Sequence, residues 1–247
     1  MSKSTNFPKT MRVGILVYDG FEPIDVWGFA EAFTISRFLG TGYLDAPAYP
    51  FEVLFISNEV RPSGQKKAVP GPVKSMNGPR VAPDMFRDDA LRQSIDILMI
   101  PGGDTGPLIE PKHSEKVKAL SNWVREMDEQ VQLMTSVCTG AAVLALAGVL
   151  DGRPATTNQS VFAWISSFGP RVLWDNVSRW VDAGHYVTSS GVSAGTDMAF
   201  HLVDRLMGRA VAETAAKSAE YDWHRDPQQP IYYPQQAAVP EPPEKKK

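Results

Sequence analysis

Short apolar runs that alternate with helix-like segments constrain the fold of this chain more than any other feature. The first run, 12–18, is rich in Val, Ile and Leu without clear alternation of polar and apolar residues, which is typical of a strand buried on both faces. Similar runs follow at 51–57, 95–100 and 131–137. Strands of this kind between helices predict an α/β layer fold with a mainly parallel sheet.

The segments between and after these runs carry helix, turn and hairpin signals. A Pro- and Gly-rich stretch at 61–83 predicts a loop or a small hairpin, and two further strands, 176–181 and 185–189, are expected to pair. A short helix is expected to end near Phe168. Longer helices are predicted, from their apolar spacing and from the Gly and Pro residues that bound them, at 23–39, 114–129, 139–147, 194–207 and 209–220.

Composition excludes several classes of function. The chain has 247 residues with 25 Lys and Arg against 28 Asp and Glu, so no dominant surface for binding nucleic acid is expected. A single cysteine excludes intrachain disulfides and zinc sites built on several thiolates. The apolar runs are too short to cross a membrane, and no signal peptide is evident. A cytoplasmic protein without a membrane partner is therefore expected.

Changes in composition predict three parts. Residues 1–10 form a polar arm, 11–222 a single α/β domain, and 223–247 a proline-rich tail. The tail leaves no room for a helix-turn-helix pair, which argues against a complete transcription regulator. Its apolar cluster at 231–233 is expected to dock on the body of the protein.

Cys138 stands where the fourth apolar run meets a helix of small residues. This order of strand, reactive residue and helix is typical of a nucleophile elbow, which exposes the side chain at a helix N-terminus. Unpaired N–H groups there are expected to favour the thiolate. The alternative is a small buried cysteine that only packs, and the pattern alone leaves both interpretations open.

Two more segments lie where ligands bind in open α/β sheets, beyond strand ends. Gly102 and Gly103 follow the third run, and their backbone N–H groups are candidates for an oxyanion hole with the amide of Thr139. The alternative is a plain turn. Asp25 is the third residue of the first helix if Pro23 is the first, a position where a carboxylate often only complements the helix dipole. If Asp25 instead faces Cys138, it is a candidate general acid or base.

Taken in order, four segments resemble the ThiJ/PfpI superfamily, related to class I glutamine amidotransferases, from about residue 12 to 220. They read GILVYDGFEPIDVWG, DILMIPGG, SVCTGAAVLALAGVLDGRPATTN and SSGVSAGTDMAFHLV. The resemblance implies a flavodoxin-like three-layer α/β sandwich and a homodimer without metal or organic cofactor. It is closest to the isonitrile hydratase branch, in which the nucleophile falls on Cys138, the acid on Asp25 and the following threonine on Thr139. The oxyanion amides then fall on Gly103 and Thr139.

Two departures from the family pattern bear on function. Protease-like members carry His directly after the nucleophile, where this chain has Thr139, so peptidase activity is disfavoured. The branch usually has His where this chain has Asn158, a side chain that forms hydrogen bonds but does not titrate near neutrality. The resemblance implies that Cys138 adds to a small electrophile, an isonitrile first of all, giving an N-substituted formamide. Glyoxalase, amidase or lyase chemistry, and a non-enzymatic redox-sensing or chaperone role, are the alternatives.

Overall fold

The computed structural model describes residues 9–40, 49–112 and 114–229, and a mainly parallel sheet forms its centre. Only the pair at one edge, β10 with β11, is antiparallel. Within the described residues the sheet has seven strands, which in spatial order are β10 (Trp180–Ala183), β11 (Tyr186–Ser189), β7 (Leu133–Ser136), β6 (Ile97–Ile100), β1 (Met11–Val17), β2 (Phe51–Ser57) and β5 (Met85–Phe86).

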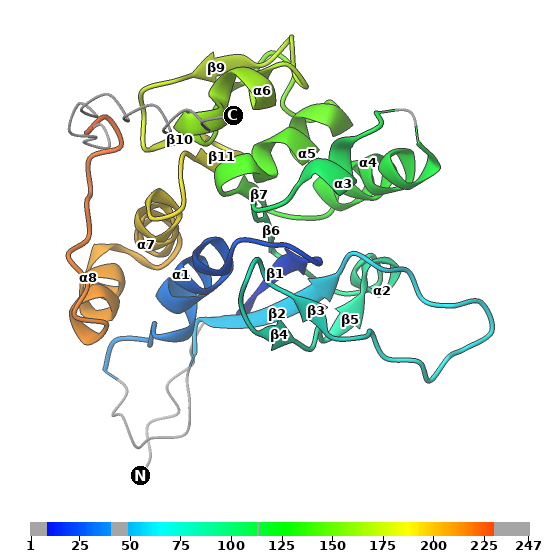
Figure 1. Ribbon diagram of the computed structural model, residues 1–247. Coiled ribbons are helices and arrows are strands. Elements are labelled where there is room, and N and C mark those ends of the chain that lie inside the picture. The colour runs from blue at the N-terminus through cyan, green and yellow to red at the C-terminus, as the bar shows by residue number, and fades with distance from the viewer. Residues whose placement is uncertain (1–8, 41–48, 113, 230–247) are drawn as a thin grey trace, which may run out of the picture.

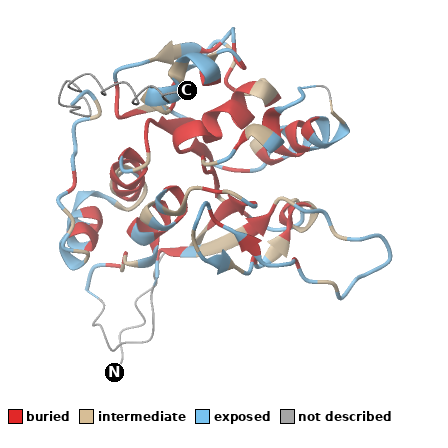
Figure 2. Cartoon of the chain, in the orientation of Figure 1, coloured by how far each residue is buried: buried red, intermediate tan, exposed pale blue. Residues whose placement is uncertain are grey.

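Helices cover both faces of this sheet (Figure 1). On one side α1 (Pro23–Thr34), α7 (Ala194–Met207) and α8 (Arg209–Ser218) pack together, and on the other α3 (Gly106–Ile109), α4 (Glu115–Asp128) and α5 (Ala141–Ala147) do so. All residues of β6 and β7 are buried, as Figure 2 shows for the centre of the molecule. The prediction of a flavodoxin-like three-layer sandwich is confirmed, because the apolar runs form the strands that helices cover on both faces.

Several short elements have no counterpart among the predicted ones. They contain two to four residues, too few for a hydrophobic period to show. A hairpin does form inside the predicted loop at 61–83, from β3 (Val73–Lys74) and β4 (Arg80–Val81). The unpredicted elements are β5, α2 (Arg87–Ala90), α3 and the two-stranded sheet of β8 (Pro154–Thr156) and β9 (Leu173–Asp175); α6 (Phe162–Ser166), by contrast, is the short helix expected before Phe168.

Most predicted boundaries differ from the structure by one or two residues, but two differ by about four or five. Helix α1 ends at Thr34 rather than at 39, because the hydroxyl of Ser36 donates to the Ala32 carbonyl at 2.7 Å and takes the place of a helical N–H donor. Strand β10 begins at Trp180 rather than at 176, because the Asp175 carboxylate accepts from the N–H groups of Val177 at 2.7 Å and Ser178 at 2.9 Å, closing a turn there.

The start of the C-terminal segment packs on α7 through buried Asp197. Its carboxylate pairs with Arg179 and accepts from the Tyr221 hydroxyl at 2.9 Å and from the His224 N–H at 3.0 Å. The indole of Trp223 donates to the Asp197 carbonyl at 3.1 Å. Residues 230–247, which include Ile231, Tyr232 and Tyr233, lie outside the described residues, so docking of that cluster stays a prediction.

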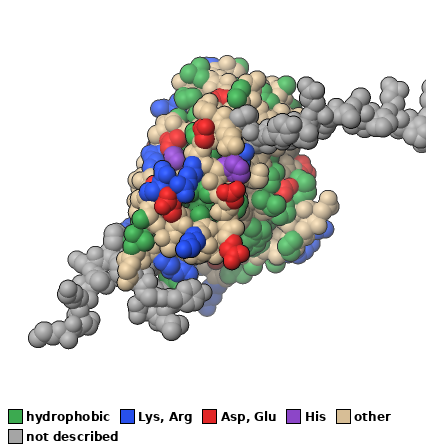
Figure 3. Space-filling model, turned by 90° about the vertical axis from the view of Figure 1, so that its left-hand side faces the viewer, with side chains coloured by type: hydrophobic (Ala, Val, Ile, Leu, Met, Phe, Trp, Pro, Cys, Tyr) green, Lys and Arg blue, Asp and Glu red, His purple; other side chains and the backbone are tan. Residues whose placement is uncertain are grey.

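Acidic, basic and histidine side chains are interspersed on the molecular face that carries α7 and α8 (Figure 3). Ion pairs such as Arg205 with Asp182 at 3.0 Å and Arg209 with Asp204 at 2.6 Å contribute to this mixture. This face therefore offers no single-sign field to a polyanion. In the described part of the chain, no helix is both long and apolar enough to span a bilayer.

The strand order reverses beside β1, and this reversal positions the candidate site. From β1 the chain first builds β2 on one side, and later crosses over to add β6 and β7 on the other. Residues that follow β1, β6 and β7 therefore meet at one edge of the sheet. In open α/β sheets the crevice at such a reversal is where ligands bind. Asp25 follows β1, Gly102 follows β6, and Cys138 follows β7.

Candidate active site

Cys138 occupies a sharp corner between β7 and α5. Its backbone is in the left-handed region with φ of 58°, a conformation that a residue with a side chain adopts only under constraint from its surroundings. The Cys138 N–H donates to the Ser190 carbonyl at 2.9 Å, and a single 3-10 turn, Cys138–Gly140, leads into the helix. The strand–turn–helix geometry of a nucleophile elbow, predicted from the sequence, is confirmed.

Glycines allow the loop after β6 to lie directly against this corner. A Cβ atom at Gly102 would stand 2.7 Å from the Thr139 nitrogen and 2.8 Å from the Cys138 Cβ. A Cβ at Gly140 would collide with the Ile100 carbonyl oxygen. Real Cβ atoms do not approach backbone so closely, so both positions require glycine for contact between the two loops.

Asp25 faces the sheet edge and does not act as a cap of its own helix. It is the third residue of α1, as predicted, and is fully buried. Its Oδ2 accepts from the Gly102 N–H at 2.7 Å, while Oδ1 has no partner of normal hydrogen-bond geometry among the described residues. The carboxyl group is therefore held by the backbone at one oxygen.

Burial raises the pKa of Asp25 to about 8, and the negative charge of Glu22 adds to the rise. The Gly102 N–H and, more weakly, the Cys138 thiol oppose it by hydrogen bonding to the carboxylate. At neutral pH the Asp25 carboxyl group thus holds its proton. A carboxylic acid that stays protonated at pH 7 is able to donate that proton, as a general acid does.

Burial also raises the pKa of the Cys138 thiol to about 12, with the Asp25 carboxylate as the second cause. Hydrogen bonds from the Asn158 side chain and the Thr139 amide lower it only in part. The expectation that the helix N-terminus makes a ready thiolate is wrong. Cys138 is only 5% exposed, and loss of hydration is the largest cause of the shift.

Asn158 lies in the site, against the sulfur. Its Nδ2 donates to the Cys138 Sγ at 3.1 Å, while its Oδ1 accepts from the Ser160 N–H at 2.9 Å and so fixes which end of the amide faces the thiol. The hydroxyl of Thr157 donates to the Cys138 carbonyl at 2.8 Å and ties the same segment to the elbow. An amide in this place stabilises negative charge on the sulfur by donating a hydrogen bond, but it does not titrate and so transfers no proton.

The backbone amides predicted to form an oxyanion hole differ in the groups that they contact. The Gly102 N–H is taken by Asp25, and the Gly103 N–H donates to the Thr139 hydroxyl at 3.2 Å. The Thr139 amide faces the sulfur, as its effect on the pKa of Cys138 shows. Gly102 therefore holds the acid in position, and a role of Gly102 or Gly103 toward a substrate oxygen stays a prediction. All six predicted residues nevertheless come together at this one edge.

Sequence reasoning missed Tyr18 and Ser190. The Tyr18 hydroxyl donates to the Gly102 carbonyl at 2.7 Å, so it supports the loop that holds Asp25, and Ser190 contributes only its carbonyl. Tyr18 ends the first apolar run, and its polar tip at the carboxyl end of a buried strand is the signal that could have identified it. Backbone acceptors such as Ser190 leave no trace in a sequence. Among the described residues, no three His, Cys, Asp or Glu side chains gather as metal ligands would.

Several known proteins are similar to this chain. Isonitrile hydratase from Pseudomonas putida is 32% identical over 151 residues, which cover 61% of this chain and 61% of the relative. The glutathione-independent glyoxalase DJR-1.2 from Caenorhabditis elegans is 27% identical, with 56% of this chain and 69% of the relative covered. The transcriptional regulator GbdR from Pseudomonas aeruginosa is 27% identical, but only 40% of it is covered, against 63% of this chain.

A similar fold occurs in the crystal structure of a ThiJ/PfpI family protein from Pseudomonas syringae, with a TM-score of 0.68 and 24% identity. The match covers 90% of this chain and 81% of that structure. The chain spans less than two thirds of the isonitrile hydratase that it matches. The model of the DJ-1/PfpI family matches residues 11–205, a range that holds Asp25, Gly102 and Cys138. With that match over most of its length, the chain belongs to the DJ-1/PfpI family.

Proposed function

We propose that the protein is an enzyme with a cysteine nucleophile that hydrates a small electrophile, first of all an isonitrile, to an N-substituted formamide. The observation that carries the proposal is the buried Asp25 carboxyl, protonated at neutral pH, beside the Cys138 thiol. Similarity to isonitrile hydratase supports it. The scheme needs no organic cofactor, because all bonds form between the thiol, the substrate and water.

The first step uses both acidic groups. Asp25 gives its proton to the terminal carbon of the isonitrile, which makes that carbon electrophilic, and the Cys138 sulfur bonds to the same carbon. The thiol proton passes to the Asp25 carboxylate. The product is a thioimidate, R–N=CH–S–Cys138, and Asp25 is again protonated. A high pKa of the thiol does not block this step, since sulfur loses its proton as the new bond forms.

Water completes the reaction. It adds to the thioimidate carbon, the nitrogen takes up one proton of that water, and the resulting tetrahedral adduct carries one hydroxyl group. Loss of the hydroxyl proton and return of a proton to sulfur then break the C–S bond. R–NH–CHO leaves and the Cys138 thiol is restored. Asn158 Nδ2, 3.1 Å from Sγ, is placed to stabilise the departing thiolate.

Substrate classes are separated by product. Incubation with tert-butyl isonitrile is expected to give N-tert-butylformamide, detected by mass spectrometry or proton NMR. If no N-tert-butylformamide forms but methylglyoxal is converted to lactate, the glyoxalase alternative is supported. Hydrolysis of activated amides supports an amidase. If Cys138 forms a stable sulfinate and none of these substrates turns over, the redox-sensing role stands and the enzymatic proposal fails.

Changing Asn158 to His is expected to add a step near pH 6.5 to the pH profile of kcat/KM, because an imidazole beside the sulfur titrates there. The wild-type profile is expected to show no such step. Gln159→His places the same group one residue further, where the native side chain contacts Thr156 and Thr157 and not the sulfur. Equal profiles for both variants would remove position 158 from the site.

We also propose that the protein is a homodimer that acts on a small molecule, with no nucleic acid or membrane partner. Membership of the DJ-1/PfpI family motivates the oligomeric state. Light scattering at micromolar concentration is expected to give twice the mass of the chain, 27.1 kDa. A monomer mass contradicts the dimer, and retention on heparin or duplex DNA at physiological salt contradicts the absence of a nucleic-acid partner.

A further inference from the structure

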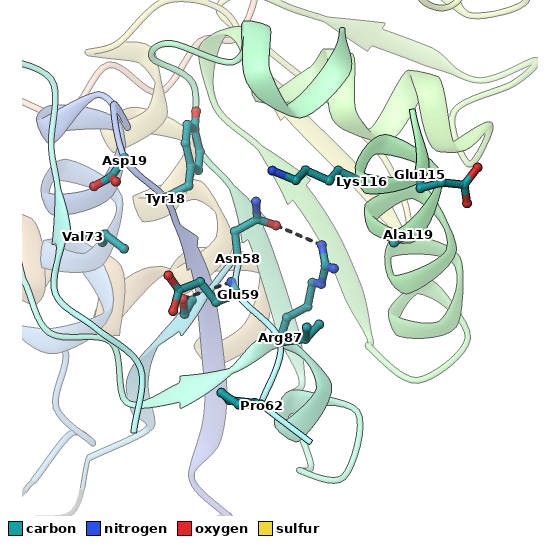
Figure 4. A pocket seen from close by; sticks show the side chains of 12 residues that line it. Tyr18, Asp19, Asn58, Glu59, Pro62, Val73, Arg87, Glu115, Lys116 and Ala119 are labelled. Carbon is teal, nitrogen blue, oxygen red and sulfur yellow. Dashed lines mark hydrogen bonds between the residues drawn. The ribbon is translucent and has the colours of Figure 1, made fainter. Parts of the chain in front are cut away.

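A cavity of about 750 Å³ lies beyond the ends of β1 and β2, and Cys138 is not among its lining residues. Its volume is in the range of sites that hold small organic ligands. Tyr18 forms part of its wall, while the hydroxyl of the same side chain turns away to Gly102 (Figure 4). The cavity is therefore a neighbour of the candidate active site and separate from it.

Arg87, at the start of α2, is the feature of this cavity that calls for a ligand. The residue is 8% exposed and lines the cavity, yet it forms no ion pair with any described residue. Its Nη1 donates to the Asn58 Oδ1 at 3.0 Å, the one side-chain hydrogen bond it makes within the described ranges. Burial lowers the pKa of Arg87. The charge of neighbouring Asp88 opposes this lowering but forms no ion pair with Arg87 among the described residues. A buried cation without an ion-pair partner is costly, and charges of this kind are normally paired.

Two further donors face the same space. Lys116 extends from the first turn of α4 into the cavity, and the amide nitrogen of Asn58 points to the same side (Figure 4). Asn58 presents this nitrogen because its oxygen is held by Arg87. A guanidinium, an ammonium and an amide N–H thus converge. Carboxylates and phosphates are the groups that such donors bind best.

The acidic residues of the wall do not neutralise these donors. Asp19 accepts from the backbone N–H of Lys74 at 2.7 Å, and the side chain of Glu115 points away from the cavity (Figure 4). Glu59 is exposed at the rim. The rest of the wall includes apolar side chains, namely Val60, Pro62, Val73 and Ala119. A cationic corner beside an apolar wall suits an organic acid with an anionic head and an apolar body.

From this geometry we infer that the cavity binds a small organic anion, with its carboxylate or phosphate head on Arg87, Lys116 and Asn58 and its apolar body against the wall of Val60 and Val73. The inference does not rest on the proposed function. Cys138→Ala is expected to bind the same ligand, and a protein without hydratase activity is expected to bind it equally well.

Calorimetric titration of the full chain with three probes tests the inference. Hexanoate and hexyl phosphate carry the two anionic heads on one apolar body, and hexanol lacks the charge. One of the two anions is expected to bind at least roughly tenfold more tightly than hexanol, as charge-assisted hydrogen bonds require. The tighter anion identifies the head group. The inference is overturned if hexanol binds as tightly as the two anions. It is also overturned if no probe binds at roughly 10 mM, a concentration at which even weak binding is detected.

Variants assign the site. Arg87→Gln and Lys116→Gln are each expected to weaken binding of the preferred anion by roughly tenfold or more. The matched control is Lys118→Gln, which removes an equal charge from the same helix, where Lys118 pairs with Glu115 at 2.9 Å. If the control weakens binding as much as Lys116→Gln does, only the general charge of the surface matters and the inference fails.

The free energy of unfolding separates a ligand site from a structural arginine. Arg87→Gln keeps the two backbone hydrogen bonds of residue 87. Its N–H donates to the Glu59 carbonyl at 3.0 Å, and its carbonyl accepts from the Trp123 indole at 2.8 Å. Without ligand the variant is expected to be at least as stable as wild type, because an unpaired buried charge is removed. A large loss of stability together with unchanged anion binding would show that Arg87 serves the fold only.

Discussion

Cys138→Ala is expected to lower turnover of the preferred substrate by about 10⁴-fold or more, because in the proposed mechanism no other group in the site forms the covalent adduct. Cys138→Ser has a similar effect, since a hydroxyl beside a protonated Asp25 is a far weaker nucleophile than a thiol. The measurement is steady-state product formation, with mass spectrometry of the wild-type protein to detect the adduct on Cys138. As the chain has one cysteine, the adduct has one place to form.

The control for this prediction is the fold of the variant. Circular dichroism and thermal unfolding of Cys138→Ala are expected to match wild type, because alanine removes only the sulfur and keeps the backbone hydrogen bond to Ser190. Wild-type activity in a folded Cys138→Ala protein contradicts every enzymatic interpretation of this site.

Asp25→Asn has the second large effect, and it acts on activity and stability in opposite directions. Turnover falls, because an amide donates no proton to the substrate carbon. Stability at neutral pH rises. The pKa of Asp25 is raised from 3.8 to about 8 in the folded protein, so folding must take up a proton at pH 7. At pH 7, which lies about three units above the unfolded pKa, that uptake costs about 4 kcal/mol, and asparagine is free of this cost.

The pH dependence identifies the cause of this gain. Because the folded pKa of Asp25 lies above the unfolded one, its contribution to stability is fully present below pH 3.8 and is lost as pH rises through about 8. The stability difference between Asp25→Asn and wild type is expected to be small near pH 4, to grow toward pH 8, and then to level off. Urea unfolding at several pH values measures it.

Asp197→Asn is the matched control, since Asp197 is equally buried but paired with Arg179. Its substitution leaves that guanidinium uncompensated, so stability is expected to fall at neutral pH. A loss of stability in Asp25→Asn as well would mean that the Asp25 carboxyl is not protonated in the folded protein. The alkaline limb of the wild-type kcat/KM profile, expected near pH 8, would then be absent.

The sequence predicts the sheet of this protein well because its central strands, β1, β6 and β7, are almost entirely buried. The runs at 12–18 and 51–57 are strands within one residue, and Ala194–Met207 is a helix with the predicted bounds. Elements such as β8 and α3 have three and four residues and depend on neighbours far along the chain. Their positions follow from tertiary packing, which a local pattern does not contain.

Which residues meet at the candidate site was predictable, but their ionisation was not. Strand ends bring Asp25, Gly102 and Cys138 together through topology alone. The pKa values of Asp25 and Cys138 depend on how completely water is excluded, and Cys138 is 5% exposed and Asp25 fully buried. The pattern around Cys138 indicated a helix N-terminus and a low thiol pKa, whereas depth of burial decides the direction of the shift.

The contact between Gly102 and the elbow limits which substitutions the candidate site can accept. Any side chain at position 102 would push this loop away from the Cys138 Cβ and the Thr139 nitrogen. It would also carry the N–H of residue 102 away from Asp25. A substitution at position 102 is therefore expected to displace Asp25 and Cys138 together. An exchange at Asn158, by contrast, alters that side chain's own hydrogen bonds to the sulfur and to Ser160 and leaves the contact between the two loops in place.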